Sequence, residues 1–95
     1  MPSKALVVIG RKHVNKYIST CIVLLHSGVD KLDIRARGQH IPKAIEVVEK
    51  LRKHYVIDLK VEDIRISSDM VAHHNEGLRR VSTIRILLSR GDQHG

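Results

Sequence analysis

The stretch Arg35-Ala36-Arg37-Gly38-Gln39-His40-Ile41-Pro42-Lys43 joins the end of one expected element to the start of the next. Before it, apolar and charged residues alternate over residues 31–36, which predicts a strand with one buried face. After it, an apolar stripe with helical spacing begins at Ile41. Gly38 supplies the backbone freedom that a tight strand-to-helix turn needs, and Pro42 lies in the first helical turn, where proline is tolerated. The stretch therefore predicts a strand–turn–helix unit.

Three cations accompany this turn. We expect Arg35, Arg37 and Lys43 to gather around the amino end of the helix. Free N–H groups and the positive end of the helix dipole favour an anion there. One interpretation is a phosphate contact, and the alternative is a solvated basic turn, which is common on protein surfaces.

The charge of the whole chain points the same way. There are 17 Lys and Arg residues against 10 Asp and Glu, which gives a formal charge of +7 and a pI near 10.0. Such an excess on 95 residues favours a polyanionic partner, with nucleic acid ahead of a membrane surface. Up to Lys43 the chain has eight basic residues and only two acidic ones, so the positive charge is concentrated.

Length and composition restrict the class of protein. A chain that is 42% hydrophobic and 28% charged fits one small globular domain, residues 1–95, with a frayed tail from about residue 91. The single cysteine, Cys21, excludes an intrachain disulfide and falls on an apolar helical stripe, which predicts a small core residue. No apolar run approaches the roughly 20 residues of a membrane span, and the amino terminus lacks a signal-peptide profile. We therefore expect a soluble cytoplasmic protein with no membrane contact.

Hydrophobic periodicity predicts six elements. They are strands over residues 5–9, 31–36, 61–69 and 81–89, and helices over residues 14–26 and 41–55. The continuous apolar run of the first strand is typical of a buried central strand. The order predicts an α/β protein of the α+β two-layer type: a βαβαββ chain with a four-stranded mixed sheet and both helices on one face.

The second helix has apolar residues beyond one stripe. We expect an inward face made of Ile41, Ala44, Ile45, Val48 and Leu51. Val47 does not share that face, and His54 and Tyr55 extend its apolar edge. Two interpretations stay open: the helix covers a second surface, such as a subunit interface, or it is wedged deeply into its own core.

The last third of the chain predicts a long hairpin. Leu59 and Val61 are out of phase with Ile64 and Ile66, which indicates a bulge or a strand that starts near residue 63. Residues 75–77 have the chemistry of a turn, and Arg79 and Arg80 follow on the returning strand. Such a hairpin would project from the body, either as an arm that enters a nucleic-acid groove or as an ordinary mobile loop.

Catalytic and metal-binding motifs do not appear in the sequence. The seven histidines are scattered over loops and helix ends, and no metalloprotease, CxxC or P-loop pattern is present. We expect neither an enzyme nor a cofactor or metal. The chain has no Phe, no Trp and two Tyr, so a base-stacking platform is excluded as well. Arginine and lysine on loops favour contacts to the phosphate backbone instead, with little dependence on base sequence.

Several segments together resemble the Alba family of small archaeal chromatin proteins, which has eukaryotic relatives in RNase P and RNase MRP. The segments are Val8-Ile9-Gly10-Arg11-Lys12, residues 24–28, Ile34-Arg35-Ala36-Arg37-Gly38 with Ile41 and Lys43-Ala44, and Arg80-Val81-Ser82-Thr83-Ile84. The similarity runs from about residue 5 to residue 90.

The resemblance implies a fold like the carboxy-terminal domain of translation initiation factor three, and a homodimer that binds double-stranded DNA and RNA with little sequence preference. It implies nucleic-acid contacts by the basic pair Arg11 and Lys12, by Arg37 and Lys43 at the turn, and by Arg79 and Arg80 on the hairpin. It also implies that dimers form through the second helix and the last two strands, and that dimers touch one another through Tyr55.

Three positions depart from the family pattern. Arg11 stands where some relatives have an acetylated lysine, and arginine keeps the charge but cannot be acetylated, which leaves Lys12 or Lys16 as substitutes. Gln39 replaces a basic residue that many relatives carry after the turn. Tyr55 replaces the commoner phenylalanine and adds a hydroxyl group.

The leading hypothesis is a dimer that coats and condenses duplex DNA as an archaeal chromatin component, associated with the chromosome in the cytoplasm, and that also binds RNA. The expected contacts are Arg11, Lys12, Lys16, Arg37, Lys43, Arg79 and Arg80, and the expected interface residues are Val47, Leu51, His54 and Tyr55. The alternatives are an RNA-binding subunit of a ribonucleoprotein and an assembly module whose basic face meets an acidic protein.

Overall fold

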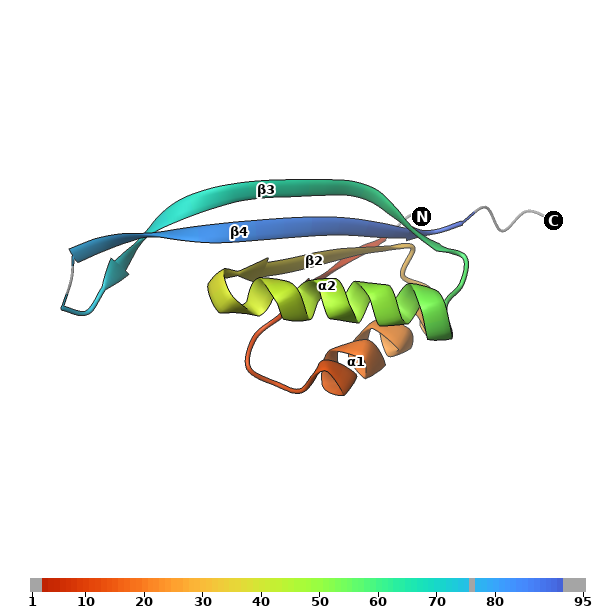
Figure 1. Ribbon diagram of the computed structural model, residues 1–95. Coiled ribbons are helices and arrows are strands. Elements are labelled where there is room, and N and C mark those ends of the chain that lie inside the picture. The colour runs from red at the N-terminus through yellow and green to blue at the C-terminus, as the bar shows by residue number, and fades with distance from the viewer. Residues whose placement is uncertain (1–2, 76, 92–95) are drawn as a thin grey trace.

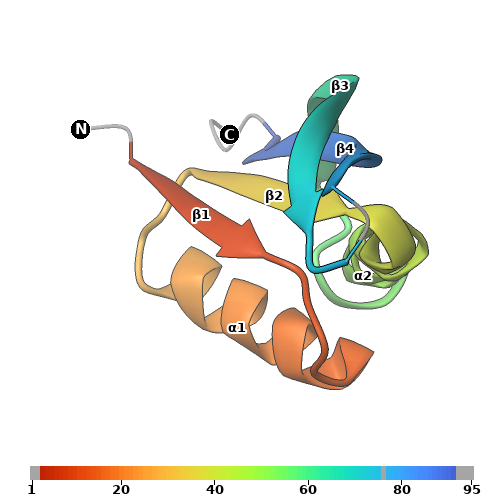
Figure 2. The same ribbon diagram turned by 90° about the vertical axis from the view of Figure 1, so that its left-hand side faces the viewer.

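Four strands and two helices form two layers in the computed structural model, which describes residues 3–75 and 77–91 (Figure 1). The elements are β1 (Lys4–Val8), α1 (Val14–His26), β2 (Lys31–Arg37), α2 (Ile41–Lys50), β3 (Leu59–His73) and β4 (Gly77–Arg90). A 3₁₀ turn, Gly38–His40, precedes α2, and a π-helical turn, Leu51–Tyr55, continues it. The βαβαββ order, the mixed sheet and the two helices on one face (Figure 2) are as predicted.

The sheet has the strand order β1-β2-β4-β3. β1 pairs in parallel with β2, whereas β4 is antiparallel to both β2 and β3. The prediction of a central position for β1 is therefore wrong, because β1 lies at one edge. Its apolar run does not mean burial on both faces: Val7 faces the helices and is buried, but Leu6 and Val8 point to the uncovered face and are 56% and 62% exposed.

The core lies between the sheet and the two helices. From α1 it receives Val14, Ile18, Cys21 and Leu25, and from α2 and its continuation it receives Ala44, Val47, Val48 and Leu51. The second set follows helical spacing but is rotated from the predicted one. Val47 is fully buried, whereas Ile45 is 46% exposed, so the expectation that Ile45 faces inward and Val47 does not is wrong.

The turn between β2 and α2 has the expected chemistry. Gly38 has φ +57°, in the left-handed region that residues with a side chain rarely adopt. Pro42 lies at the start of α2, where its missing N–H removes no helical hydrogen bond. Both predictions for this stretch are confirmed.

The hairpin of β3 and β4 is longer than predicted. The two strands pair from Leu59 opposite Arg90 to His73 opposite Gly77, with a register shift between Val61 and Asp63 that confirms the bulge. β2 reaches only as far as the pair Arg37 and Thr83. Residues 68–73 and 77–82, which we call the hairpin arm, therefore extend beyond the three-stranded region and project from the body (Figure 1). Of the turn at the tip, His74 and Asn75 are among the described residues.

A charged side chain is buried on the uncovered face of the sheet. Asp33 on β2 is 2% exposed. Its carboxylate accepts hydrogen bonds from Arg35 Nε and Nη2 at 3.3 and 2.9 Å and from Arg85 Nε at 3.1 Å. Burial alone would raise the pKa of Asp33, but the hydrogen bonds and charges of the two arginines outweigh it, so the pKa lies below its ordinary value.

Asp33→Asn should lower the free energy of unfolding by about 2 kcal/mol near neutral pH, because Arg35 and Arg85 then face each other without a counter-charge. Denaturant titrations at several pH values measure this. A lowered folded-state pKa contributes stability above the unfolded-state pKa of about 3.9 and loses it as the pH falls toward the folded-state pKa. The difference in the free energy of unfolding between the unaltered protein and the variant should therefore shrink below about pH 4.

The matched control is Asp69→Asn, which removes an exposed carboxylate from β3 and should change the stability by less than about 0.5 kcal/mol. If Asp33→Asn remained less stable than the unaltered protein at low pH, the stabilising role assigned to the Asp33 carboxylate would be contradicted.

Candidate nucleic-acid interface

Three basic segments lie where β1 and β2 end, and we call this end of the sheet the basic edge. The segments are the loop of residues 10–13, the turn with Arg37 and the hairpin arm. β1 and β2 are parallel, so their carboxyl ends meet, and the Ile9 N–H donates to the Arg35 carbonyl at 2.8 Å. The loop of residues 10–13 follows β1 there, and the turn with Arg37 follows β2. The hairpin arm leaves from the same edge because β4 runs antiparallel to β2 (Figure 1). Segments that are far apart in the sequence are thus brought together by strand direction alone.

The loop of residues 10–13 is held by the Tyr17 hydroxyl. Its oxygen accepts hydrogen bonds from the Gly10 N–H at 2.9 Å and from the Lys12 N–H at 3.1 Å. At the end of the loop, His13 Nδ1 accepts from the Asn15 N–H at 3.1 Å and caps α1. Sequence analysis assigned no role to Tyr17, because its place in the helix of residues 14–26 does not show which groups its hydroxyl contacts.

Lys43 reaches back to the same loop from α2. Its Nζ donates to the Gly10 carbonyl at 2.8 Å and to the Lys12 carbonyl at 2.7 Å, and it lies 5.9 Å from the centre of the Tyr17 ring. We call Tyr17 and Lys43 the loop clamp. The ammonium group of Lys43 is thus occupied by backbone carbonyls, while Arg11 and Lys12 are exposed. Lys43 orients the cations of the loop as well as adding its own charge.

Lys16 and Arg37 flank this loop. Lys16 is exposed in the first turn of α1, and Arg37 is exposed at the end of β2. The amino end of α2 has no side-chain cap, and the Ile41 N–H donates to the Gly38 carbonyl of the preceding 3₁₀ turn, so Arg37 adjoins a helix end that is already partly satisfied by its own backbone. Arg35 does not join them, contrary to expectation, because it turns onto the uncovered face of the sheet toward Asp33. Alternation along β2 should have indicated that Arg35 and Asp33 share a face.

The hairpin arm carries the last two predicted cations. Arg79 pairs with Val71 and Arg80 with Met70, and both arginines are exposed. Arg80 Nη1 donates to Ser68 Oγ at 3.1 Å, a cross-strand bond within the arm. The arm presents its basic residues beyond the edge where Arg11, Lys12 and Arg37 lie.

The predicted interface residues fall into two groups. Val47 and Leu51 are fully buried in the core of the chain, so they offer no surface to a second subunit; for these two, the alternative of a helix wedged into its own core is the observed one. His54 is exposed, and Tyr55 is 57% exposed at the end of the π-helical turn.

Apolar side chains that sequence analysis did not name among the interface residues are exposed beside α2, on the helix and the strand that the resemblance assigns to the dimer contact. Ile64, Ile66 and Met70 on β3 are 55%, 79% and 55% exposed, and Ile45 on α2 is exposed as well. Ile66 lines a shallow groove of about 490 Å³ with Ile41 and Ile84. We call Ile45, Ile64, Ile66 and Met70 the apolar strip. Exposed apolar surface of this kind is typical of a protein–protein contact.

Other kinds of site find no support in the described part of the chain. Cys21 is fully buried, as predicted for a core residue, and this burial raises the pKa of its thiol to about 12, which does not suit a nucleophile. In residues 3–75 and 77–91, no three His, Cys, Asp or Glu side chains gather as metal ligands would. The helices of this part are too short or too polar to cross a bilayer.

These features define a class: small α+β domains that present a clamped basic loop, a basic turn and a projecting hairpin at one edge of the sheet. A model of the Alba family matches residues 5–68. The chain belongs to the Alba family, and the resemblance seen in its motifs is confirmed.

Individual relatives agree in sequence and in fold. The DNA/RNA-binding protein Alba 1 of Archaeoglobus fulgidus is 34% identical over 84 residues, which cover 88% of this chain and 93% of that protein. The solved structure of Alba from Thermoplasma volcanium is 31% identical, covers 90% of this chain and 100% of its own, and superimposes with a TM-score of 0.87. The structure of ALBA1 from Trypanosoma brucei, 25% identical, gives 0.73 over 92% of this chain and 69% of its own.

Lys43→Met should loosen the basic loop without unfolding the protein. A hydrogen bond to a charged donor contributes roughly 1.5–3 kcal/mol, so the amide hydrogens of Gly10 and Lys12 should exchange with solvent at least about tenfold faster. Hydrogen exchange followed by NMR measures each amide. Lys50→Met is the matched control, since Lys50 is on the same helix but pairs with Glu46 at 3.2 Å on its exposed face. Unchanged exchange at both amides would exclude the clamp.

Proposed function

We propose that this protein is a homodimer that binds double-stranded DNA with little sequence preference, coats and condenses it as an archaeal chromatin component, and also binds RNA. It would then be associated with the chromosome in the cytoplasm. The contacts are electrostatic: phosphates are gripped by Arg11, Lys12, Lys16 and Arg37 and by the hairpin arm with Arg79 and Arg80. Release of counterions from the polyanion drives this kind of binding.

The single observation that carries the proposal is the clamped loop. Arg11 and Lys12 project from a backbone that is fixed at both Gly10 and Lys12 by the Tyr17 hydroxyl and the Lys43 ammonium group. A loop ordered before binding loses less conformational entropy when it meets its ligand. Basic side chains on an ordered backbone, next to a projecting arm, suit a stiff and regular polyphosphate such as a duplex better than a flexible acidic segment of a protein.

The names of the relatives support nucleic acid as the ligand of this chain, and they favour RNA as a second candidate beside DNA. The proteins from Archaeoglobus fulgidus, Methanocella arvoryzae and Thermoplasma volcanium are all named DNA/RNA-binding protein Alba. RNA within a ribonucleoprotein is therefore the second candidate for the main ligand, bound through the same basic edge.

The apolar strip supports a dimer. Ile64 and Ile66 share a face with their buried β4 partners Ile86 and Ile84, yet they remain exposed because α2 does not reach them. A second copy related by a two-fold axis would cover the strip with its own α2 and β3. Such a dimer would place two clamped loops and two arms on one ligand. His54 and Tyr55 lie at the far end of α2 and remain candidates for contacts between dimers.

Reversing the charge of the basic pair, Arg11→Glu with Lys12→Glu, should weaken binding to a DNA duplex at least about 100-fold at 0.1 M salt, because contacts to several phosphates per dimer are lost. For the unaltered protein, six to eight contacts predict a slope of about −5 to −7 for log K against log salt concentration. Filter binding or fluorescence anisotropy measures both quantities on unrelated sequences.

The matched control is Lys50→Glu with Lys53→Glu, an equal change of charge on exposed residues of α2 and its continuation. An unaltered affinity of the Arg11 and Lys12 variant would favour an acidic protein partner instead. A preference of about tenfold or more for an RNA duplex over the matched DNA duplex would favour the ribonucleoprotein.

Ile66→Asp should convert the dimer into a monomer, since a buried carboxylate in an apolar interface is strongly unfavourable. Light scattering at micromolar concentration measures the molar mass. Val23→Asp, which changes a 66% exposed residue of α1, is the control and should leave the mass unaltered. A dimer that survives Ile66→Asp would place the contact between subunits elsewhere.

A further inference from the structure

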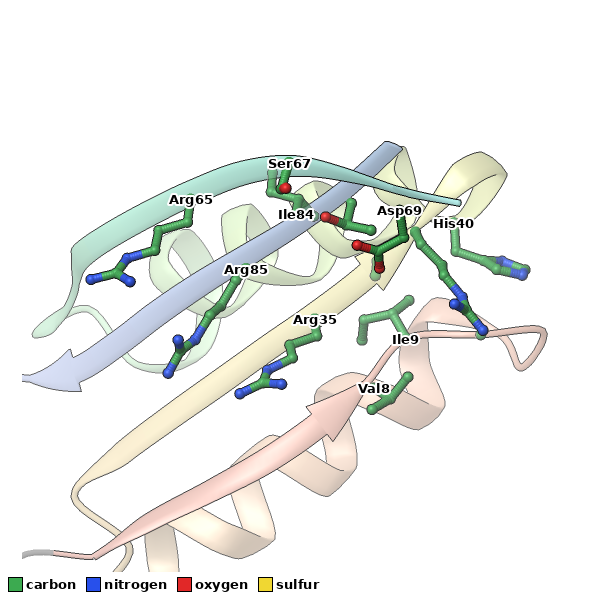
Figure 3. Close-up of a pocket in the computed structure, with 13 residues that line it drawn as sticks. Val8, Ile9, Arg35, His40, Arg65, Ser67, Asp69, Ile84 and Arg85 are labelled. Carbon is green, nitrogen blue, oxygen red and sulfur yellow. The ribbon is translucent and has the colours of Figure 1, made fainter. Parts of the chain in front are cut away.

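Three arginines form a row across the uncovered face of the sheet. Arg85 of β4 pairs directly with Arg35 of β2 on one side and with Arg65 of β3 on the other. Directly paired residues point to the same face, and neighbouring strands are about 4.8 Å apart, so the guanidinium groups leave the sheet close together. Figure 3 shows the three side chains running in the same direction. We call them the arginine row.

The arginine row is only partly neutralised. Asp33 accepts from Arg35 and Arg85, and Asp63 accepts from Arg65 Nε at 2.9 Å. Three cations thus share two carboxylates. Only the Nε atoms of Arg65 and Arg85 are engaged, and their terminal amino groups have no partner among residues 3–75 and 77–91. Like charges that face each other across strands destabilise a sheet, so an anion bound to the unused donors would stabilise this row.

The arginine row lines a groove of about 600 Å³ on this face (Figure 3). The side chains of the row remain accessible: those of Arg35, Arg85 and Arg65 are 48%, 35% and 71% exposed. Val8 adds an apolar wall, and Ser67, Asp69 and Thr83 add polar groups. At one end the groove reaches Arg37 and His40, next to the basic edge described above.

We propose that this groove binds a short segment of single-stranded RNA. Guanidinium groups bind phosphates through paired N–H donors, and their planes also stack on bases. Arginine stacking can therefore replace the aromatic side chains that this face of the sheet lacks. The hydroxyl groups of Ser67 and Thr83 and the carboxylate of Asp69 suit the ribose 2′-hydroxyl, which both donates and accepts. The volume is that of a small-ligand pocket, so a splayed strand enters and a duplex does not.

This site goes beyond the duplex interface. The groove shares Arg37 and, on the hairpin arm, Asp69 with the duplex interface. The arginine row itself lies on the face of the sheet and takes no part in that interface, so substitutions in the row test the two sites separately. The most informative substitution is Arg65→Gln, because Arg65 is the most exposed of the three and its loss leaves the Asp33 pairs intact. Arg85→Lys keeps a charge beside Asp33 but removes the planar fork.

The experiment is a fluorescence anisotropy titration of the full chain with three labelled probes: a mixed-sequence RNA strand of about ten nucleotides, the DNA strand of the same sequence, and a DNA duplex. Arg65→Gln should weaken binding of the RNA strand about fivefold, and the double variant with Arg85→Lys about tenfold, with the duplex changed less than about twofold. Lys53→Gln removes one charge from a remote, 66% exposed side chain and is the control.

Several outcomes would overturn the site. They are equal losses for Arg65→Gln and Lys53→Gln, equal losses for the RNA strand and the duplex, or equal affinity of the unaltered protein for the RNA and DNA strands. Failure of the duplex interface would look different: Arg11→Glu with Lys12→Glu would leave duplex binding intact while the effect of Arg65→Gln on the RNA strand persisted.

Discussion

The parallel pairing of β1 with β2 is the constraint on which the arrangement of the basic edge depends. Two parallel strands end at the same edge of a sheet, so the loop after β1 and the turn after β2 become neighbours although Arg11 and Arg37 are far apart in the sequence. Adding β4 antiparallel to β2 makes the hairpin arm leave from that edge too. No contact between these segments is needed to gather them, because strand direction and register do so.

Charge by itself does not tell what a cation does in this fold. Arg11 and Lys12 are exposed, whereas the Lys43 ammonium group is held by two carbonyls and Arg35 is held by a buried carboxylate. All belong to the same basic half of the chain. The difference arises from the element that carries each residue: a loop leaves a side chain in solvent, while a helix packed against that loop or a strand beside an aspartate supplies partners.

The sequence was informative where local chemistry decides the structure. The helix of residues 14–26, the glycine turn at Gly38 and the bulge after Val61 follow from spacing and backbone preference. Prediction from the sequence failed where the burial or position of a residue depends on which other element covers it. The edge position of β1, the exchange of Ile45 for Val47 on the buried face of α2, and the clamp formed by Lys43 all depend on distant segments, which periodicity does not report.

The helix layer is narrower than the sheet and covers only one of its faces, and these two features together account for both exposed surfaces (Figure 2). Ile84 and Ile86 of β4 are buried, but their direct partners on β3, Ile66 and Ile64, are exposed, so the helical layer ends between these two strands. On the helix side the narrow helix layer leaves the apolar strip in contact with water. Burial of this strip against other apolar surface would be favourable. On the opposite face no element of residues 3–75 or 77–91 covers the sheet, and the same strands carry arginines whose charge an anion can neutralise. One sheet, covered only in part, thus carries the proposed dimer surface on one face and the proposed RNA site on the other.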